Sequence, residues 1–366
     1  MTGFLKGKDP LEKNKLLIIV VLVLIFGVSV ILISISERHY IEMETQKVGI
    51  TRLILSRAGA RRLLSFFRRV QSSMTTLSYE ENAFSCEKTE DPCLMRVSMQ
   101  NYENTPLVGF IRFDAQGKAV VSMDHETTRI RSEVDVSDRN YFLWAKNQKT
   151  SDEAYLSKPI ISRGSLSFSG RKVVSVVTPF FKNDVFDGGV AGAVDLERLV
   201  SEYIRDVAYY QETNAFVFDE EGTILLQAFP GEASLTGKNL TEILNGKKPQ
   251  VLGESTPQEI LQQIVSGEDG WLTIPDGTIF GAPSQKVILG YAPLEFGGKR
   301  WFFVSTILEN EAFEGFRAYR QILGGSLLIA GLCIVIVGFL SLYTMRVAES
   351  EWYKRGYNHG KDSRSN

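Results

Sequence analysis

Two stretches of the chain are almost purely apolar and contain no charged residue. The first runs from Leu16 to Ile35 and the second from Ile322 to Tyr343. About 20 apolar residues are enough to cross a bilayer as a helix, so both stretches are predicted to be transmembrane helices. A cleaved signal peptide is the alternative for the first stretch, but its apolar region would be shorter and a small-residue cleavage site would follow it. Residues 36–39 lack such a site, which favours an uncleaved anchor.

Basic residues flank both apolar stretches on the side of the chain ends. They are Lys6, Lys8, Lys13 and Lys15 before the first stretch, and Arg346, Lys354, Arg355, Lys361 and Arg364 after the second. An excess of lysine and arginine marks the cytoplasmic side of a membrane. Residues 1–15 and 344–366 are therefore predicted to be cytoplasmic tails. Residues 36–320 are expected to lie in the periplasm or outside the cell.

The segment 37–81 has the apolar spacing of a helix and contains no proline. Its apolar positions include Ile50, Leu53, Ile54, Ala58, Leu63, Leu64, Phe67, Val70, Met74 and Leu77. This period predicts one long helix, continuous or nearly so with the first apolar stretch. Arginines fill many of the other positions. They form either a solvated helix face or a surface for an anionic partner.

After Pro106 the pattern changes to short β-rich runs separated by turns. Residues 107–113 and 118–122 flank the turn 114–117, and residues 214–218 and 223–227 flank the turn 219–222. Both turns have the pattern Phe-Asp-x-x-Gly, which predicts two similar hairpins and hence two α/β units in tandem.

Each unit contains a second strand pair. In the first unit, 172–178 pairs with 188–195 across a turn at 179–187, and a helix at 196–211 links the units. In the second, 286–292 pairs with 300–307 across a turn at 297–299. Hairpin connections imply antiparallel sheets, so the predicted fold class is α+β.

Composition narrows the function. The net charge is −2, which argues against a nucleic-acid partner. Three cysteines, three histidines and the absence of a Walker loop, an HExxH or a Gly-x-Ser-x-Gly motif give no reason to expect an enzyme, a cofactor or a metal site. Cys86 and Cys93 lie in the outer segment, where they form either a disulfide or two unpaired thiols. Their even number in an oxidising compartment favours the disulfide.

Three short motifs follow one another in the first unit. They are Arg139-Asn140-Tyr141-Phe142, then Tyr155-Leu156-Ser157-Lys158-Pro159, and the glycine- and valine-rich strand that ends at Asp195. Together with the long helix and the tandem units, this order resembles the double Cache (dCache) sensor domains of chemoreceptors, sensor kinases and diguanylate cyclases. The resemblance implies two PAS-like antiparallel-sheet subdomains, a membrane-distal one at about 82–200 and a membrane-proximal one at about 205–307.

The resemblance also implies a ligand site in the membrane-distal subdomain. By position, Arg139 would bind a carboxylate, Tyr141 and Phe142 would cap the pocket, Tyr155 would line it, and Asp195 would pair with a ligand ammonium. A guanidinium fork does match a carboxylate, and aromatic rings provide apolar walls. Each residue also has a structural alternative: Arg139 on the surface, the aromatic residues in the core, and Asp195 as a helix N-cap. The ligand is accordingly an amino acid or another small carboxylate.

These observations predict a sensor with two spans in the plasma or inner membrane, acting alone or as a homodimer. The tail after Tyr343 is too short to bury a core, so a separate signalling protein such as a kinase or cyclase is expected to receive the signal. The alternative is a structural or interaction subunit of an envelope complex that binds no ligand.

Overall fold

The computed structural model describes residues 10–79, 93–125, 128–130, 134–163, 169–205, 214–228, 236–245, 257–274 and 285–362. The chain divides into two units. One consists of Gln46–Ala312, and the other combines Met1–Thr45 with Phe313–Asn366.

The unit that combines Met1–Thr45 with Phe313–Asn366 contains the N-terminal part of one long helix and all of another. Helix α1 spans Pro10–Tyr79 and α9 spans Glu314–Asp362. Each contains a stretch long and apolar enough to cross a membrane. Side chains such as Leu24, Ile31 and Leu328 are exposed, whereas the core helix of a soluble protein would bury them. Exposed apolar helices of this length are what the predicted membrane spans require.

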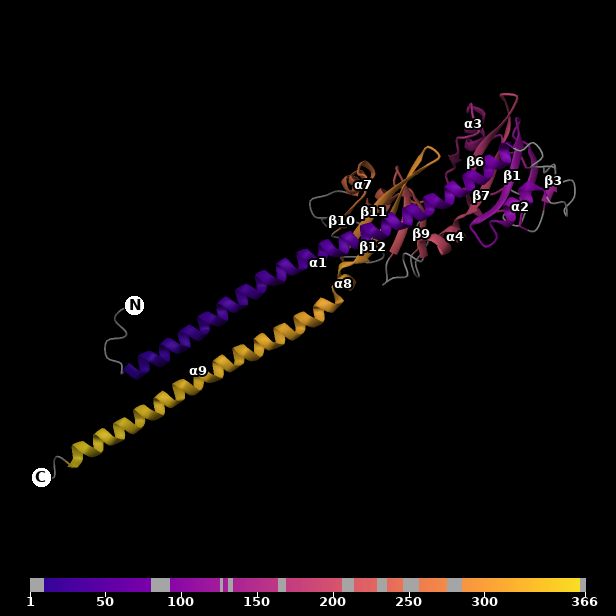
Figure 1. Cartoon of the computed structure of the whole chain (residues 1–366). Helices are drawn as coiled ribbons and strands as arrows, with labels where there is room; N and C mark the ends of the chain where they lie inside the picture. The colour runs from indigo at the N-terminus through magenta and orange to yellow at the C-terminus, as the bar shows by residue number, and fades with distance from the viewer. Residues whose placement is uncertain are drawn as a thin grey trace. The chain divides into compact units, whose positions relative to one another are not determined.

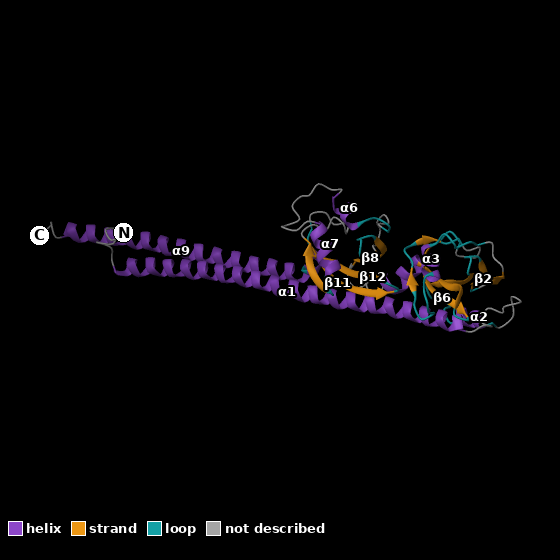
Figure 2. Cartoon of the chain, turned by 90° about the horizontal axis from the view of Figure 1, so that it is seen from above, coloured by secondary structure: helices purple, strands orange, loops and turns teal. Residues whose placement is uncertain are grey.

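The unit Gln46–Ala312 contains two antiparallel sheets (Figure 2). The first sheet has the strand order β3-β2-β1-β7-β6-β4, with β5 also paired to β6. Its strands are β1 (Leu107–Asp114), β2 (Ala119–Asp124), β3 (Thr128–Ile130), β4 (Tyr155–Leu156), β5 (Ile160–Ile161), β6 (Lys172–Lys182) and β7 (Val185–Asp195). The helices of this part are α2 (Leu94–Gln100), α3 (Asn140–Lys146), α4 (Leu196–Leu199) and the π-helical turn η1 (Val200–Ile204).

The second sheet has the strand order β10-β11-β12-β8-β9. Its strands are β8 (Asn214–Asp219), β9 (Ile224–Ala228), β10 (Gly270–Ile274), β11 (Val287–Phe296) and β12 (Lys299–Leu308). Short helices accompany them: α6 (Leu240–Asn245), α7 (Pro257–Ser266) and α8 (Glu309–Ala312). The long helix, the two similar hairpins β1–β2 and β8–β9, and the α+β class are confirmed; the subdomain boundaries stay a prediction.

The predicted turn at 179–187 is wrong. Strand β6 continues to Lys182, β7 begins at Val185, and the turn between them is Asn183–Asp184. Both turn residues have positive φ, 51° and 63°, as a two-residue hairpin turn requires. Pro179 lies inside the strand, opposite Gly189. The predicted linking helix 196–211 begins at Leu196, changes to π-helical geometry at Val200, and lies outside the described residues from 206 onward.

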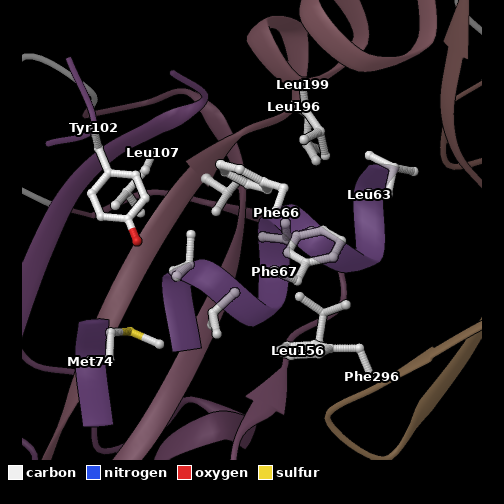
Figure 3. Close-up of a cluster of buried hydrophobic side chains, with 14 of the residues drawn as sticks. Leu63, Phe66, Phe67, Met74, Tyr102, Leu107, Leu156, Leu196, Leu199 and Phe296 are labelled. Atoms are coloured by element: carbon white, nitrogen blue, oxygen red, sulfur yellow. The ribbon is translucent and has the colours of Figure 1, made fainter. Parts of the chain in front are cut away.

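Helix α1 contributes side chains to an apolar core that includes residues of both sheets. In Figure 1 the part of α1 after Gln46 runs alongside both sheets. Gly59 packs against the ring of Phe303 in β12. Further along the helix, Phe67 stacks on Phe296 at a centroid distance of 5.5 Å and meets the edge of Trp301 at 5.7 Å. Figure 3 shows Phe67 beside Phe296 of the second sheet and Leu156 of the first. One apolar cluster therefore joins the helix to both sheets.

The opposite faces of the sheets carry the short helices. In Figure 2, α1 and α3 lie on opposite sides of the first sheet. Helix α7 contributes Ile260 and Ile264, four residues apart and so on one helix face, to the core of the second sheet. The first sheet is thus covered by α1 on one face and by α3 with its neighbouring loops on the other. The candidate site lies under this second cover.

Cys93 is buried immediately before α2. Cys86 lies outside the described residues, so the Cys86–Cys93 disulfide stays a prediction. Cys333 is the free cysteine in the described part of the chain.

Candidate functional site

A small cavity of about 20 Å³ lies between the first sheet and the segments that cover it. Its lining residues come from five stretches of the chain and are Ile111, Val134, Val136, Arg139, Tyr141, Ile160, Ser162, Arg163, Val173, Ser175, Ala191 and Ala193. We call this space the distal cavity, after the predicted membrane-distal subdomain.

The sheet side of the distal cavity follows from strand register. Ile111 on β1 is opposite Ala191 on β7, and Ser175 on β6 is opposite Ala193. Because side chains alternate between the two faces of a sheet, these positions point to one side while their neighbours point to the other. The neighbour Gly192 faces Val70 and Met74 of α1. Ala191 and Ala193 have small side chains, so the side of β7 that faces the cavity leaves space for it.

Arg139 is at the N-cap position of α3, with extended backbone. Arg139 lines the cavity, and its Nη2 donates a hydrogen bond to the carbonyl oxygen of Ile161 at 3.0 Å. This contact connects α3 to the segment around β5 across the cavity mouth. Because the acceptor is a neutral carbonyl, the positive charge of Arg139 is not neutralised by this contact.

Arg163 is the second guanidinium of the distal cavity. Its Nη1 donates to both carboxylate oxygens of Asp138, each at 2.8 Å. This hydrogen bonding holds the pKa of Asp138 below its usual range, so Asp138 is an anion at neutral pH. Both side chains of the pair are about half exposed, 52 % and 57 %. Exposed ion pairs contribute little to stability, so the pair can exchange partners at low cost.

Tyr141 is the main aromatic residue of the cavity. The residue is only 5 % exposed, and its ring packs on Phe113 at a centroid distance of 6.2 Å. Burial raises the pKa of its hydroxyl to about 12. Tyr141 is therefore neutral at physiological pH, and its hydroxyl keeps its proton as a hydrogen-bond donor.

The other three predicted residues lie elsewhere. Phe142 is in the core, edge-on to Phe113 at 5.7 Å, as its structural alternative predicts. Tyr155 stacks on Trp144 at 5.2 Å, beside the site rather than in its lining. Asp195 is the N-cap of α4. The structure thus brings Arg139 and Tyr141 together in the cavity and sets the other three apart from it.

The contacts of Asp195 account for its whole carboxylate. One oxygen accepts hydrogen bonds from the backbone N–H groups of Glu197 at 2.9 Å and Arg198 at 3.2 Å. The other oxygen pairs with Nη1 of Arg171 at 2.9 Å. The residue is 1 % exposed. The N-cap alternative for Asp195 is therefore what the structure has.

Sequence reasoning missed Arg163, Ser162 and Ser175. Arg163 comes shortly after the Tyr-x-Ser-x-Pro motif, but nothing in its immediate neighbours marks it as a site residue. Ser175 is, with Thr178, one of two polar residues inside the otherwise apolar middle of β6, and that is the signal that could have found it. Among the described residues, no group of three His, Cys, Asp or Glu side chains is placed to hold a metal ion.

A second hollow of about 380 Å³ lies between residues 158–161 and the hairpin β8–β9 of the second sheet. Lys158, in its lining, has its Nζ 3.4 Å from Oε1 of Glu221. Ile160 lines both this hollow and the distal cavity. The segment around β5 is therefore shared between the distal cavity and the second sheet.

No protein-family model matches the sequence, and no curated protein matches it. The fold, in contrast, is similar to several solved structures. The extracellular domain of vpHK1S-Z8, described as a histidine kinase, is 14 % identical, with a TM-score of 0.52 over 78 % of this chain and 99 % of that one. The periplasmic sensory domain of the Campylobacter jejuni chemoreceptor Tlp1 is 12 % identical, with a TM-score of 0.51 over 74 % and 98 %.

An extracellular ligand binding receptor from Desulfohalobium retbaense is 15 % identical, with a TM-score of 0.49 over 70 % of this chain. The match spans 40 % of that receptor's own length. At these identities the likeness concerns the fold. The described fold is that of the double Cache type of extracytoplasmic sensor domain, as the sequence resemblance implied.

Proposed function

We propose that this protein is a membrane-anchored extracytoplasmic sensor that binds a small carboxylate or an amino-acid-like ligand in the distal cavity. The observation that carries the proposal is that two arginines, Arg139 and Arg163, and Tyr141 line one cavity together with apolar residues of the sheet. Binding sites are typically apolar hollows with a few such polar groups. The fold is one that extracytoplasmic sensors use.

The chemistry of this lining suits a carboxylate. A guanidinium presents a planar fork of donors that a lysine ammonium lacks. The present acceptors of the two arginines are the carbonyl of Ile161 and the carboxylate of Asp138. A ligand carboxylate offers Arg139 a charged acceptor in place of a neutral one, which makes a stronger hydrogen bond. The methyl and methylene groups of a ligand would then contact Ile111, Ala191 and Ala193.

The proposed signal passes from the cavity to the membrane helices and then to a separate signalling protein such as a kinase or cyclase. In this proposal both termini are cytoplasmic and the two sheets are periplasmic or extracellular. A ligand shifts a conformational equilibrium only if it binds one conformation better than the other. Helix α1 is the element through which such a conformational change would reach the membrane helices, because its side chains pack into the core of both sheets.

The proposal is tested with the intact chain in detergent micelles or nanodiscs. Thermal shift against a panel of small organic acids and amino acids identifies a ligand, and isothermal titration gives its affinity. Losing a hydrogen bond to a charged group costs about 1.5–3 kcal/mol, so Arg139→Ala should weaken binding roughly 10- to 150-fold. Arg139→Lys should recover only part of the loss.

Arg68→Ala is the matched control, because Arg68 is exposed on α1. Binding that Arg139→Ala and Arg68→Ala leave equally strong would refute the proposal. If no panel ligand binds and the protein instead co-purifies with an envelope complex, the result supports the structural role.

A further inference from the structure

The hollow between residues 158–161 and the hairpin β8–β9 has the volume of a small-molecule site. It measures about 380 Å³, against about 20 Å³ for the distal cavity. Sites for small molecules usually enclose about 300–1,000 Å³. We call this space the inter-sheet hollow, because one wall belongs to the first sheet and the other to the second. A ligand the size of an aromatic ring fits into this hollow without displacing its walls.

Both walls are held in place by backbone pairing within their own sheets. On one side, Ile161 of β5 is opposite Lys172 of β6. On the other side, the backbone N–H of Ile224 donates to the carbonyl oxygen of Lys238 at 3.0 Å, and the N–H of Gly237 donates to the carbonyl oxygen of Ile224 at 2.7 Å. Walls that are already ordered reduce the entropic cost of binding a ligand.

The two sides that face each other across the hollow are largely apolar. Pro159, Ile160 and Ile161 line one side, and Ile224 and Leu225 line the other. Ile224 and Leu225 are 1 % and 2 % exposed and belong to the apolar cores, so the side formed by β9 is firmly packed. Ile161, in contrast, is 51 % exposed. An exposed apolar side chain at the edge of an apolar hollow is a surface that a ligand can cover.

The charged residues of the described lining differ in depth. Lys158 and Lys172 are exposed, whereas Asp219 is only 6 % exposed. The Oδ1 atom of Asp219 accepts a hydrogen bond from the backbone N–H of Thr223 at 2.7 Å, so this carboxylate holds the β8–β9 turn. The lysines are therefore the charged groups that an approaching ligand meets first.

Lys158 can bind a ligand and keep its present partner. Its Nζ is 3.4 Å from Oε1 of Glu221, and both side chains are more than half exposed, 59 % and 53 %. An ammonium group has three hydrogen-bond donors, so a second anion can join Glu221. The exposed pair is itself weak, and a released Glu221 would stay hydrated, so its negative charge is a small obstacle to an anionic ligand.

From these observations we infer that the inter-sheet hollow is a second ligand site, separate from the distal cavity, for an amphipathic monocarboxylate. The ligand is an aromatic ring or a short aliphatic chain that carries one acidic group. Its apolar body contacts Ile161, Ile224 and Leu225. Its carboxylate is bound by Lys158 and Lys172 at the solvent side.

The test uses two probes of the same size and shape that differ in charge, phenylacetate and phenylacetamide. Isothermal titration of the intact chain in nanodiscs, with empty nanodiscs as the blank, should give an affinity about tenfold higher for the acid, because two exposed charge pairs contribute to its binding. Lys158→Gln combined with Lys172→Gln should reduce the affinity for the acid to that for the amide. Lys146→Gln is the matched control, since Lys146 is an exposed lysine on α3 outside the lining, and it should leave both affinities unchanged.

Ile161→Ser tests the contact with the apolar body. It should weaken the binding of both probes about fivefold, because less apolar surface is buried. The side chain is half exposed, so the variant should keep the wild-type melting temperature, which shows that the fold is intact.

The outcomes are independent of the proposed function. If neither probe binds above the blank, or if the lysine and Ile161 variants leave phenylacetate binding unchanged, the inference is overturned. If the amide binds as tightly as the acid, the assignment of an anionic ligand to the lysines is overturned. Arg139→Ala should leave phenylacetate binding unchanged; if it abolishes that binding, the probe occupies the distal cavity, and the inference falls while the proposed function is supported.

Discussion

A single buried hydroxyl connects α1 to the second sheet. The Oγ atom of Ser56 donates a hydrogen bond to the carbonyl oxygen of Gly290 at 2.8 Å and accepts one from the backbone N–H of Ser305 at 3.0 Å. Gly290 and Ser305 face each other in the β11–β12 pair. The helix thus satisfies one backbone donor and one backbone acceptor of the sheet, and Ser56 itself is fully buried.

We predict that Ser56→Ala lowers the free energy of unfolding by about 3 kcal/mol. The substitution removes the partner of two buried backbone groups, and each such loss costs about 1–3 kcal/mol. Alanine has a better helix propensity than serine, which returns roughly 0.5 kcal/mol. Ser65→Ala is the control on the same helix: Ser65 is exposed, so the propensity gain should stand alone.

The measurement is urea unfolding of the intact chain in a mild detergent, followed by tryptophan fluorescence. Trp301, which is 3 % exposed, reports on the core between α1 and the second sheet. The affinity for a ligand of the distal cavity should change little, because Ser56 does not line the cavity. If Ser56→Ala and Ser65→Ala unfold within about 0.5 kcal/mol of each other, the hydroxyl does not hold the helix to the sheet.

Two further predictions concern the packing and the titration of the second sheet. A Cβ atom at Gly290 would collide with backbone atoms of Arg52 and Leu53, whereas a Cβ atom at Gly192 would meet only side-chain ends. Gly290→Ala should therefore lower the melting temperature far more than Gly192→Ala. Equal shifts of the melting temperature would contradict the close contact between α1 and β11. Burial raises the pKa of Asp219 above the ordinary 3.8, so the folded state disfavours its charged form and unfolding free energy should fall as pH rises through the window between the two pKa values. Asp219→Asn should lack this fall in pH-dependent urea titrations, and a wild-type curve that rises there relative to the variant would show the sign to be wrong.

The periodic parts of the fold could be predicted from the sequence. Helical spacing over 37–81 and the two Phe-Asp-x-x-Gly turns gave α1 and the hairpins, because these signals are local. Pro179 predicts the start of the turn between β6 and β7, but β6 continues through it to Lys182. The stronger signal was Asn183-Asp184, a residue pair that tolerates the positive φ of a two-residue turn.

The site was less predictable, because a cavity depends on contacts between distant residues. Arg139 and Tyr141 could be named because they belong to one short motif. Ser175 enters the lining through the register that sets it opposite Ala193, and that register is fixed by the whole sheet. Asp195 shows the reverse case: its place directly before the first residue of α4 made the N-cap role readable from the sequence.

The same segment that closes the distal cavity also contacts the second sheet, and this gives the proposed signal a physical route. Ile160 and Arg163 line the cavity. A few residues earlier, Leu156 is packed so closely on Gly297 of the β11–β12 turn that a Cβ there would collide with its backbone. A carboxylate that takes Arg139 away from Ile161 therefore acts on a segment in contact with the β11–β12 hairpin. That hairpin is hydrogen-bonded to α1 through Ser56, so the Ser56→Ala variant should still bind ligand but transmit binding to α1 less strongly.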